Sequence, residues 1–71
     1  MTERTADVWV REWPASTTFY PATARGRSWI GENFDPDTVQ DEHGGWCVNT
    51  EHAPPIIAAM KAAGLEVLRR R

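Results

Sequence analysis

Apolar and polar positions near the start of the chain follow the pattern of two β-strands. Residues 8–13 (VWVREW) and 17–20 (TTFY) are rich in β-branched and aromatic side chains, which favour strands. Residues 14–16 (PAS) lie between these segments and favour a turn. We therefore expect a β-hairpin that follows a frayed start at residues 1–6.

A helix is predicted next, beginning near Pro21, and Thr23 is a suitable N-cap for it. Small and apolar residues then recur at the spacing of one helical face: Ala22, Gly26, Trp29, Ile30 and Phe34. Gly26 and Gly31 each disfavour a helix by about 1 kcal/mol relative to alanine, so packing must hold this helix. Such small residues also permit a close approach to the sheet. Asp35-Pro36 ends the helix, because the residue before a proline is pushed out of the α region.

A long acidic connection and a third strand follow the first helix. Residues 35–45 contain one expected short turn at residues 37–40 and end in two glycines. Residues 46–51 (WCVNTE) are then expected to form the strand.

The second predicted helix has signals at both of its ends. Pro54 and Pro55 suit a first turn, and Gly64 suits the left-handed position after the last turn. Four residues form its expected buried stripe: Ile56, Ile57, Met60 and Ala63. Residues 65–68 are then expected to form the last strand.

The resulting order, ββαβαβ, predicts an α/β fold of the α+β two-layer type: a small four-stranded sheet covered on one face by two helices. One domain is expected over residues 1–71, with a basic tail at 69–71. The strand order and the use of the second sheet face stay open. So short a chain buries only about 60% of its unfolded surface, and we expect at least one of its four tryptophans at an interface.

Targeting and cross-linking signals narrow the class of protein. The opening residues MTERTAD have neither a basic n-region nor an apolar h-region. The longest apolar run, residues 56–60, is far shorter than the roughly 20 residues that cross a bilayer. Cys47 is the single cysteine, so no internal disulfide forms. These features predict a cytoplasmic protein without membrane contact.

The net charge of −2 is distributed unevenly. Six carboxylates occur in a stretch without lysine or arginine: Glu32, Asp35, Asp37, Asp41, Glu42 and Glu51. Basic candidates lie outside this stretch: Arg25, Arg27, Arg69, Arg70 and Arg71. An acidic side and a basic side are therefore predicted, although most surface charge serves solubility. Glu32 and Asp35 oppose the dipole of the first helix, which favours an external role for them.

Motifs for catalysis or metal binding are sparse. His43, Cys47 and His52 are zinc-type ligands, but a cysteine within a strand and a histidine in a loop are not forced together by their spacing. A packed strand cysteine with two surface histidines is the alternative interpretation. No base or oxyanion site identifies Cys47 as a nucleophile, and P-loop, dinucleotide, HExxH and GxSxG motifs are missing. We therefore predict no enzyme activity, no metal and no cofactor.

Three segments carry a resemblance to a known group of proteins. They are Pro21-x-Thr23-x-x-Gly26-x-x-Trp29-Ile30-x-Glu32-Asn33, residues 45–51 (GWCVNTE), and Met60-x-x-Ala63-Gly64-Leu65-x-Val67. Over about residues 8–68 the chain resembles short bacterial and phage proteins of prophages and other mobile elements, which have no assigned activity. It departs from them at Gly26, where alanine is usual, and at Pro54-Pro55, where an Arg-Tyr pair is common. The resemblance implies a mobile-element origin and a small α/β fold.

A mobile-element origin implies a protein that binds and blocks host machinery, as anti-CRISPR proteins do. The resulting hypothesis is a non-enzymatic inhibitor whose carboxylates imitate nucleic-acid phosphates against a CRISPR effector subunit, with Trp9 or Trp46 as an aromatic anchor. One alternative is an accessory protein that binds nucleic acid through Arg25, Arg27 and the tail at 69–71. Another is a structural homodimer joined through the open sheet face or an edge strand.

Overall fold

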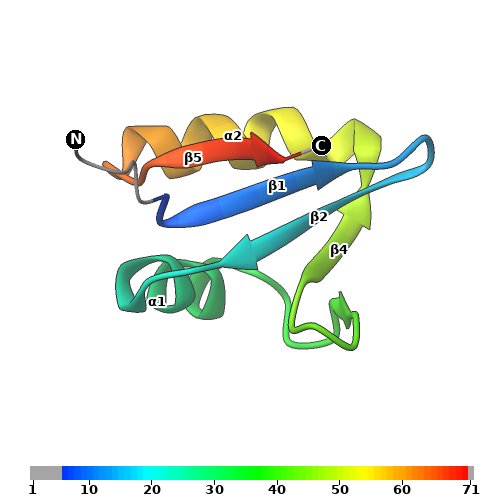
Figure 1. Ribbon diagram of the computed structural model, residues 1–71, viewed down its shortest axis with the longest axis horizontal. Coiled ribbons are helices and arrows are strands. Elements are labelled where there is room, and N and C mark those ends of the chain that lie inside the picture. The colour runs from blue at the N-terminus through cyan, green and yellow to red at the C-terminus, as the bar shows by residue number, and fades with distance from the viewer. Residues whose placement is uncertain (1–5, 71) are drawn as a thin grey trace.

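A computed structural model describes residues 6–70 of the chain. It contains five strands in one mixed sheet: β1 (Val8–Glu12), β2 (Ser16–Pro21), β3 (Val39–Gln40), β4 (Trp46–Asn49) and β5 (Val67–Arg70). Its helical segments are α1 (Ala24–Asn33), the 3₁₀ turn η1 (Thr50–His52) and α2 (Ala53–Ala62) (Figure 1). The sheet order is β3-β4-β2-β1-β5, and β1 pairs with β5 in parallel, whereas the other pairs are antiparallel.

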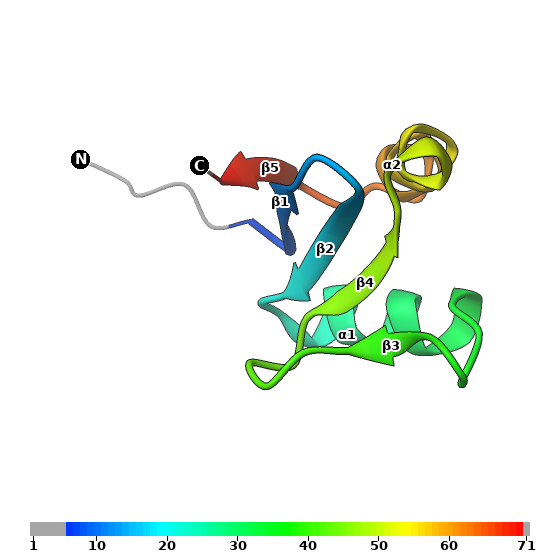
Figure 2. The ribbon, with the colours of Figure 1, turned by 90° about the vertical axis from the view of Figure 1, so that its right-hand side faces the viewer.

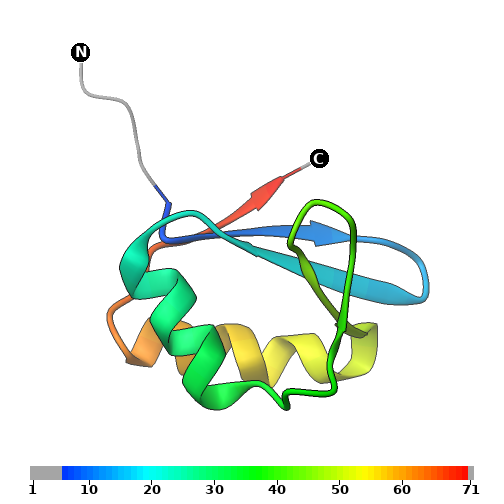
Figure 3. The ribbon, with the colours of Figure 1, turned by 90° about the horizontal axis from the view of Figure 1, so that it is seen from below.

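Both helices cover the same face of this sheet, so the predicted two-layer α+β fold is confirmed (Figures 2 and 3). Burial alternates along the first residues of β1, as a sheet with one covered face requires, whereas β2 buries Thr17, Thr18 and Phe19 in succession. Val8, Val10 and Phe19 point into the core and are fully buried. They meet Ile30 of α1 and Met60 of α2, which are also fully buried.

The prediction of four strands was wrong by one, because β3 adds a short edge strand to β4. Val39 and Gln40 are both exposed, so β3 shows no alternation of buried and exposed residues that a sequence pattern could reveal. The expected turn at residues 37–40 lies slightly earlier, since the Thr38 N–H donates to the Asp35 carbonyl at 2.9 Å.

Four aromatic rings close the core near the β3 and β4 side of the sheet. Phe34, directly after α1, lies edge-on to Phe19 and Trp46, with ring centroids 5.6 and 5.7 Å apart. Trp29 lies edge-on to the same ring at 6.4 Å. Edge-to-face pairs of this kind stabilise a core beyond the area that they bury.

A network that we call the N-terminal joint holds the start of β1 against α1 and β5; its residues are Asp7, Ala22, Thr23, Gly26 and Glu66. The Asp7 carboxylate accepts hydrogen bonds from the Thr23 hydroxyl at 2.7 Å and from the Glu66 N–H at 2.9 Å. Its backbone carbonyl accepts the Ala22 N–H at 2.8 Å. The two hydrogen bonds to the carboxylate, first that from Glu66 and then that from Thr23, hold the pKa of Asp7 below its ordinary value.

Local signals in the sequence explain how the helices start and end. Thr23 is the N-cap of α1, as expected, because its hydroxyl accepts the Gly26 N–H at 3.1 Å. A Cβ at Gly26 would collide with the Asp7 carbonyl, so the expected close approach of the helix to the sheet is confirmed there. Gly31 has open space around it. Gly64 follows α2 with a φ of 88°, in the left-handed region that favours glycine.

The ends of several elements differ from the sequence interpretation. Ala6 was placed in a frayed segment, but it is fully buried, and residues 1–5 lie outside the described residues. β4 ends at Asn49 rather than at residue 51, because the 3₁₀ turn η1 begins at Thr50. β5 runs two residues later than predicted, so Arg69 and Arg70 belong to a strand rather than to a tail, and Arg71 lies outside the described residues.

Candidate functional site

Four exposed carboxylates lie between the last turn of α1 and the loop after β3. Figure 2 shows the path of this segment, which includes the edge strand β3. We call these carboxylates the acidic edge: Glu32, Asp35, Asp37 and Glu42. Glu51 is exposed as well, but it lies in η1 at the opposite end of β4 from Glu42. Five of the six predicted acidic residues are therefore exposed, and four of them share one edge.

The carboxylates of the acidic edge differ in how strongly the fold engages them. Within residues 6–70, the carboxylates of Glu32 and Asp37 form no hydrogen bond or ion pair, and the last turn of α1 has no basic residue. Asp35 accepts the Asp37 N–H at 2.8 Å, which shapes the turn after α1. Glu42 lies 3.7 Å from the Nε2 atom of His43, and both side chains are mostly exposed.

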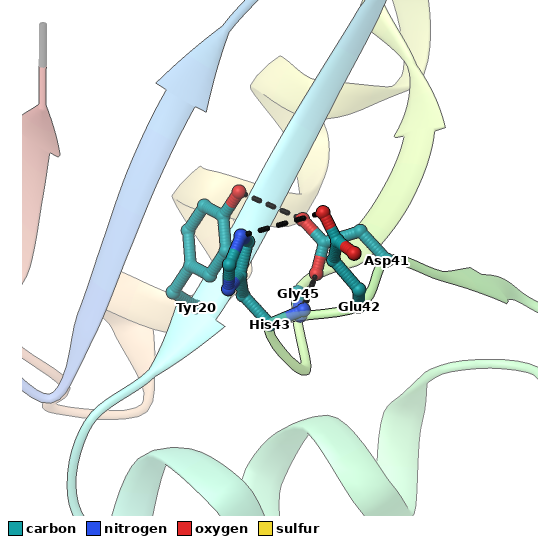
Figure 4. Close-up of polar contacts among 5 residues, drawn as sticks. All are labelled: Tyr20, Asp41, Glu42, His43 and Gly45. Atoms are coloured by element: carbon teal, nitrogen blue, oxygen red, sulfur yellow. Dashed lines mark hydrogen bonds and ion pairs between the residues drawn. The ribbon is translucent and has the colours of Figure 1, made fainter.

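Asp41, predicted as a partner-binding residue, closes a loop within the fold (Figure 4). Its Oδ1 atom accepts the N–H groups of Gly45 at 2.7 Å and His43 at 2.9 Å. Its Oδ2 atom accepts the Tyr20 hydroxyl at 2.8 Å. The bond from Gly45 first, and that from Tyr20 second, lower the pKa of Asp41, and the bond to Asp41 raises the pKa of Tyr20.

The two predicted aromatic anchors lie on opposite faces of the sheet. Trp46 is opposite Phe19 in the strand register and packs edge-on against Phe34, so it belongs to the core side. Trp9 lies on the uncovered face, where its register partners are Tyr20 and Leu68. Both rings are half-buried, but only Trp9 lies on the uncovered face of the sheet.

A shallow hollow of about 450 Å³ lies between α1 and the end of α2, beside the acidic edge. Trp29 and Glu32 of α1 form one wall, and Ala63 and Leu65 form the other. Arg25 crosses it at one end, where its Nη2 atom donates to the Gly64 carbonyl at 2.6 Å. The sequence interpretation assigned Trp29 to the core and missed this role, although its spacing of three residues from Glu32 places both on one side of a helix.

The predicted basic residues whose side chains the structure describes lie on two separate elements. Arg25 and Arg27 are exposed on α1, whereas Arg69 lies on β5, 3.9 Å from Glu12. Arg70 is the register partner of Arg11. Arg11 itself is 4.5 Å from the ring centroid of Trp13, an exposed cation–π contact near the hairpin turn.

The structure does not bring the three zinc-type residues together. His43 lies in the loop before β4, Cys47 in β4 and His52 in η1 after it. The Cys47 sulfur is 3.5 Å from the Thr18 hydroxyl, and His52 is 3.7 Å from Glu51. In the part of the chain that the structure describes, no group of three or more His, Cys, Asp and Glu residues is placed to hold a metal ion.

Comparisons with protein-family models, with curated proteins and with solved structures find no match to this chain. None of the helices within residues 6–70 has the length and apolar character needed to cross a membrane.

Proposed function

We propose that this protein is a non-enzymatic binding protein of phage or mobile-element origin that acts in the cytoplasm. Its proposed role is that of an anti-CRISPR inhibitor, and its proposed partner is a CRISPR effector subunit. The acidic edge would occupy a basic channel of that nucleic-acid-handling complex and so exclude nucleic acid from it. This role needs neither a cofactor nor direct binding to nucleic acid.

The acidic edge is the observation that carries the proposal. Residues 28–60 contain six carboxylates and no lysine or arginine, so no neighbouring cation in the sequence neutralises the edge. A group of exposed negative charges attracts a surface built to bind phosphates and accelerates the encounter with it. Glu32 lies in the last turn of α1, where a negative charge opposes the helix dipole, so helix stability does not account for it.

Charges beside a short edge strand have a competing explanation, since they also prevent two sheets from joining edge to edge. An edge that serves only this purpose needs negative charge but no partner. Removal of the charge separates the two explanations, because a binding edge would lose inhibition whereas a purely protective edge would allow self-association.

An inhibition assay with paired variants tests the proposal. Purified CRISPR effector complexes with their guide RNA are tested for DNA cleavage in the presence of the wild-type protein and of the double variant Asp37→Asn/Glu42→Gln. The expected result is salt-sensitive inhibition by the wild type that the variant loses, with an unchanged melting curve. The matched control is Glu12→Gln/Glu51→Gln, which removes the same charge from other surfaces.

Two results would contradict the proposal. Equal inhibition by the wild type and the acidic-edge variant removes the acidic mechanism. A wild-type protein that inhibits no effector, and that recovers no effector subunit from host lysate in low salt, removes the anti-CRISPR role.

A structural homodimer is the second candidate, favoured by the uncovered face of the sheet. Trp9, Tyr20 and Leu68 lie side by side there, and Val39 at the edge is 68% exposed. Apolar side chains on an uncovered face are typical of association surfaces. Sedimentation velocity decides this candidate: a dimer that Trp9→Thr dissociates supports it, whereas a wild-type monomer at high concentration excludes it.

A further inference from the structure

The hollow beside α1 combines an aromatic wall with a carboxylate. Trp29 and Glu32 are three residues apart on α1, so they lie next to each other on the helix surface. Leu65 and Ala63 form the apolar wall on the other side. The Trp29 ring is half-buried, which leaves part of it open to the hollow.

The hollow also has opposite charges at its two ends. Arg25 and Glu32 are seven residues apart, or about 10 Å along the helix. Arg25 is occupied at its own end by the Gly64 carbonyl. Within residues 6–70 the Glu32 carboxylate has no hydrogen bond or ion pair, so the end nearest the acidic edge offers an unused acceptor beside a ring.

We propose that this hollow binds an arginine side chain of the partner protein. The guanidinium would pair with the Glu32 carboxylate, and its plane would lie against the Trp29 ring. Arginine fits this pair of groups better than lysine, because its planar guanidinium stacks on aromatic faces and pairs with a carboxylate through two N–H groups. The proposal rests on the proposed function, since a basic, nucleic-acid-binding surface supplies such arginines, and it locates an anchoring point beside the acidic edge.

Charge complementarity argues for a cationic occupant rather than an apolar one. Asp35 and Asp37 follow Glu32 closely in the sequence, and both are exposed. A cation that approaches from this end therefore meets negative charge before it reaches the hollow. Ala63 and Leu65 would shield part of the bound cation from water, and such shielding strengthens an ion pair and a cation–π contact alike.

A titration followed by ¹⁵N–¹H NMR tests this site. The probes are two short peptides, an arginine–glycine repeat and the matching lysine–glycine repeat, and the signals followed are the indole N–H groups of the four tryptophans. We expect the Trp29 signal to shift most and the arginine peptide to bind about two- to fivefold more tightly than the lysine peptide.

Two charge variants separate a specific site from general attraction. Glu32→Gln and Glu51→Gln each remove one exposed carboxylate, so they change the net charge equally. Glu32→Gln is expected to weaken the arginine peptide about two- to fivefold, and Glu51→Gln is expected to have a smaller effect. Equal effects of the two variants, or a larger shift at Trp9 or Trp13 than at Trp29, would overturn the proposal.

Ring variants test the stacking contact. Trp29→Leu keeps an apolar side chain but removes the ring, and it is expected to abolish the preference for arginine over lysine. Trp29→Phe keeps a smaller ring and is expected to restore part of that preference, which a purely structural role of Trp29 would not do. A preference unchanged in Trp29→Leu, in protein whose NMR spectrum stays folded, contradicts the proposal.

The same variants distinguish this inference from the function on which it rests. If Asp37→Asn/Glu42→Gln loses effector inhibition while Glu32→Gln and Trp29→Leu retain it, the hollow is not the anchoring point and the acidic mechanism stands. If the arginine peptide binds the hollow but no effector is inhibited, the site stands and the proposed function fails.

Discussion

The N-terminal joint and the acidic edge both depend on carboxylates, yet they use them in opposite ways. In the joint, Asp7 accepts two hydrogen bonds from residues that are far from it in the sequence, Thr23 and Glu66. On the acidic edge, Glu32 and Asp37 form no such bond within residues 6–70. One carboxylate therefore holds elements together, whereas the others leave their charge available to a partner. A count of acidic residues cannot separate these two uses, because it contains no information about which donors fold against each carboxylate.

Asp41 shows how easily the two uses are confused. It lies in sequence among the residues of the acidic edge, but three hydrogen bonds engage its carboxylate, as in the joint. Charge reversal at Asp41 would therefore report on folding rather than on binding. A binding test of the edge needs Asp37 and Glu42 without it.

The strongest way to break the joint is to add a methyl group at its tightest point. Gly26→Ala places a Cβ against the Asp7 carbonyl, so we expect a loss of about 2 kcal/mol in the free energy of unfolding despite the higher helix propensity of alanine. Gly31→Ala in the same helix meets open space and is expected to add about 0.5–1 kcal/mol. Urea denaturation of both variants checks this pair, and equal effects at the two glycines would contradict it.

Acid is expected to weaken both the N-terminal joint and the loop that Asp41 closes. Because the pKa values of Asp7 and Asp41 are lowered from 3.8 by folding, their stabilisation is present above that value. It is lost as the pH falls through the lower folded-state values. Asp7→Asn is expected to destabilise the protein at neutral pH and to flatten this loss, whereas Asp37→Asn is expected to change neither. Denaturation midpoints measured across the acid range check the expectation, and parallel pH profiles for the two variants would oppose it.

Tyr20 offers a test of the loop that Asp41 closes, because its hydroxyl donates to the Asp41 carboxylate. Tyr20→Phe removes the hydroxyl that Asp41 accepts and is expected to cost about 1 kcal/mol. The pKa of Tyr20 is raised from 10.0, so the contribution of its hydroxyl is present below that pH and is lost as the pH rises through the raised value. The wild type should therefore lose stability in strong base in a step that Tyr20→Phe lacks. Fluorescence-detected denaturation at neutral and alkaline pH measures both effects.

The smallest expected change in stability concerns Glu32 on the acidic edge. Glu32→Lys replaces a charge that opposes the α1 dipole with one that favours it, so stability is expected to rise by about 0.3–1 kcal/mol. Binding to an arginine-rich partner is expected to fall in the same variant. A thermal melt and the peptide titration measure the two changes, and a destabilised Glu32→Lys protein would show that the fold uses this carboxylate after all.

Elements with strong local signals could be predicted from the sequence. The hairpin follows from its two aromatic and β-branched runs, α1 from the Thr23 cap, and α2 from its prolines and from Gly64. β3 could not be predicted, because two exposed residues carry no alternation and the loop that joins them to β4 is closed by hydrogen bonds to Asp41.

The candidate site was harder to predict than the fold, because it depends on contacts between distant residues. The exposed acidic residues could be identified from composition, as could the lack of cations among them. The internal role of Asp41 depends on Tyr20, twenty-one residues earlier, and the hollow depends on Leu65 lying against α1. No spacing within the sequence encodes either contact.

The parallel pairing of β1 with β5 has a consequence for how the chain acquires its structure. Val8 lies opposite Val67, so the edge of β1, which precedes the other strands of the sheet in sequence, is completed by β5, which follows them all. Loop-closure entropy must be overcome over almost sixty residues before this contact forms, which makes it a slow step relative to the hairpin. Until then the outer edge of β1 offers unpaired N–H and C=O groups, and a nascent chain that stops short of residue 67 exposes a template for aggregation.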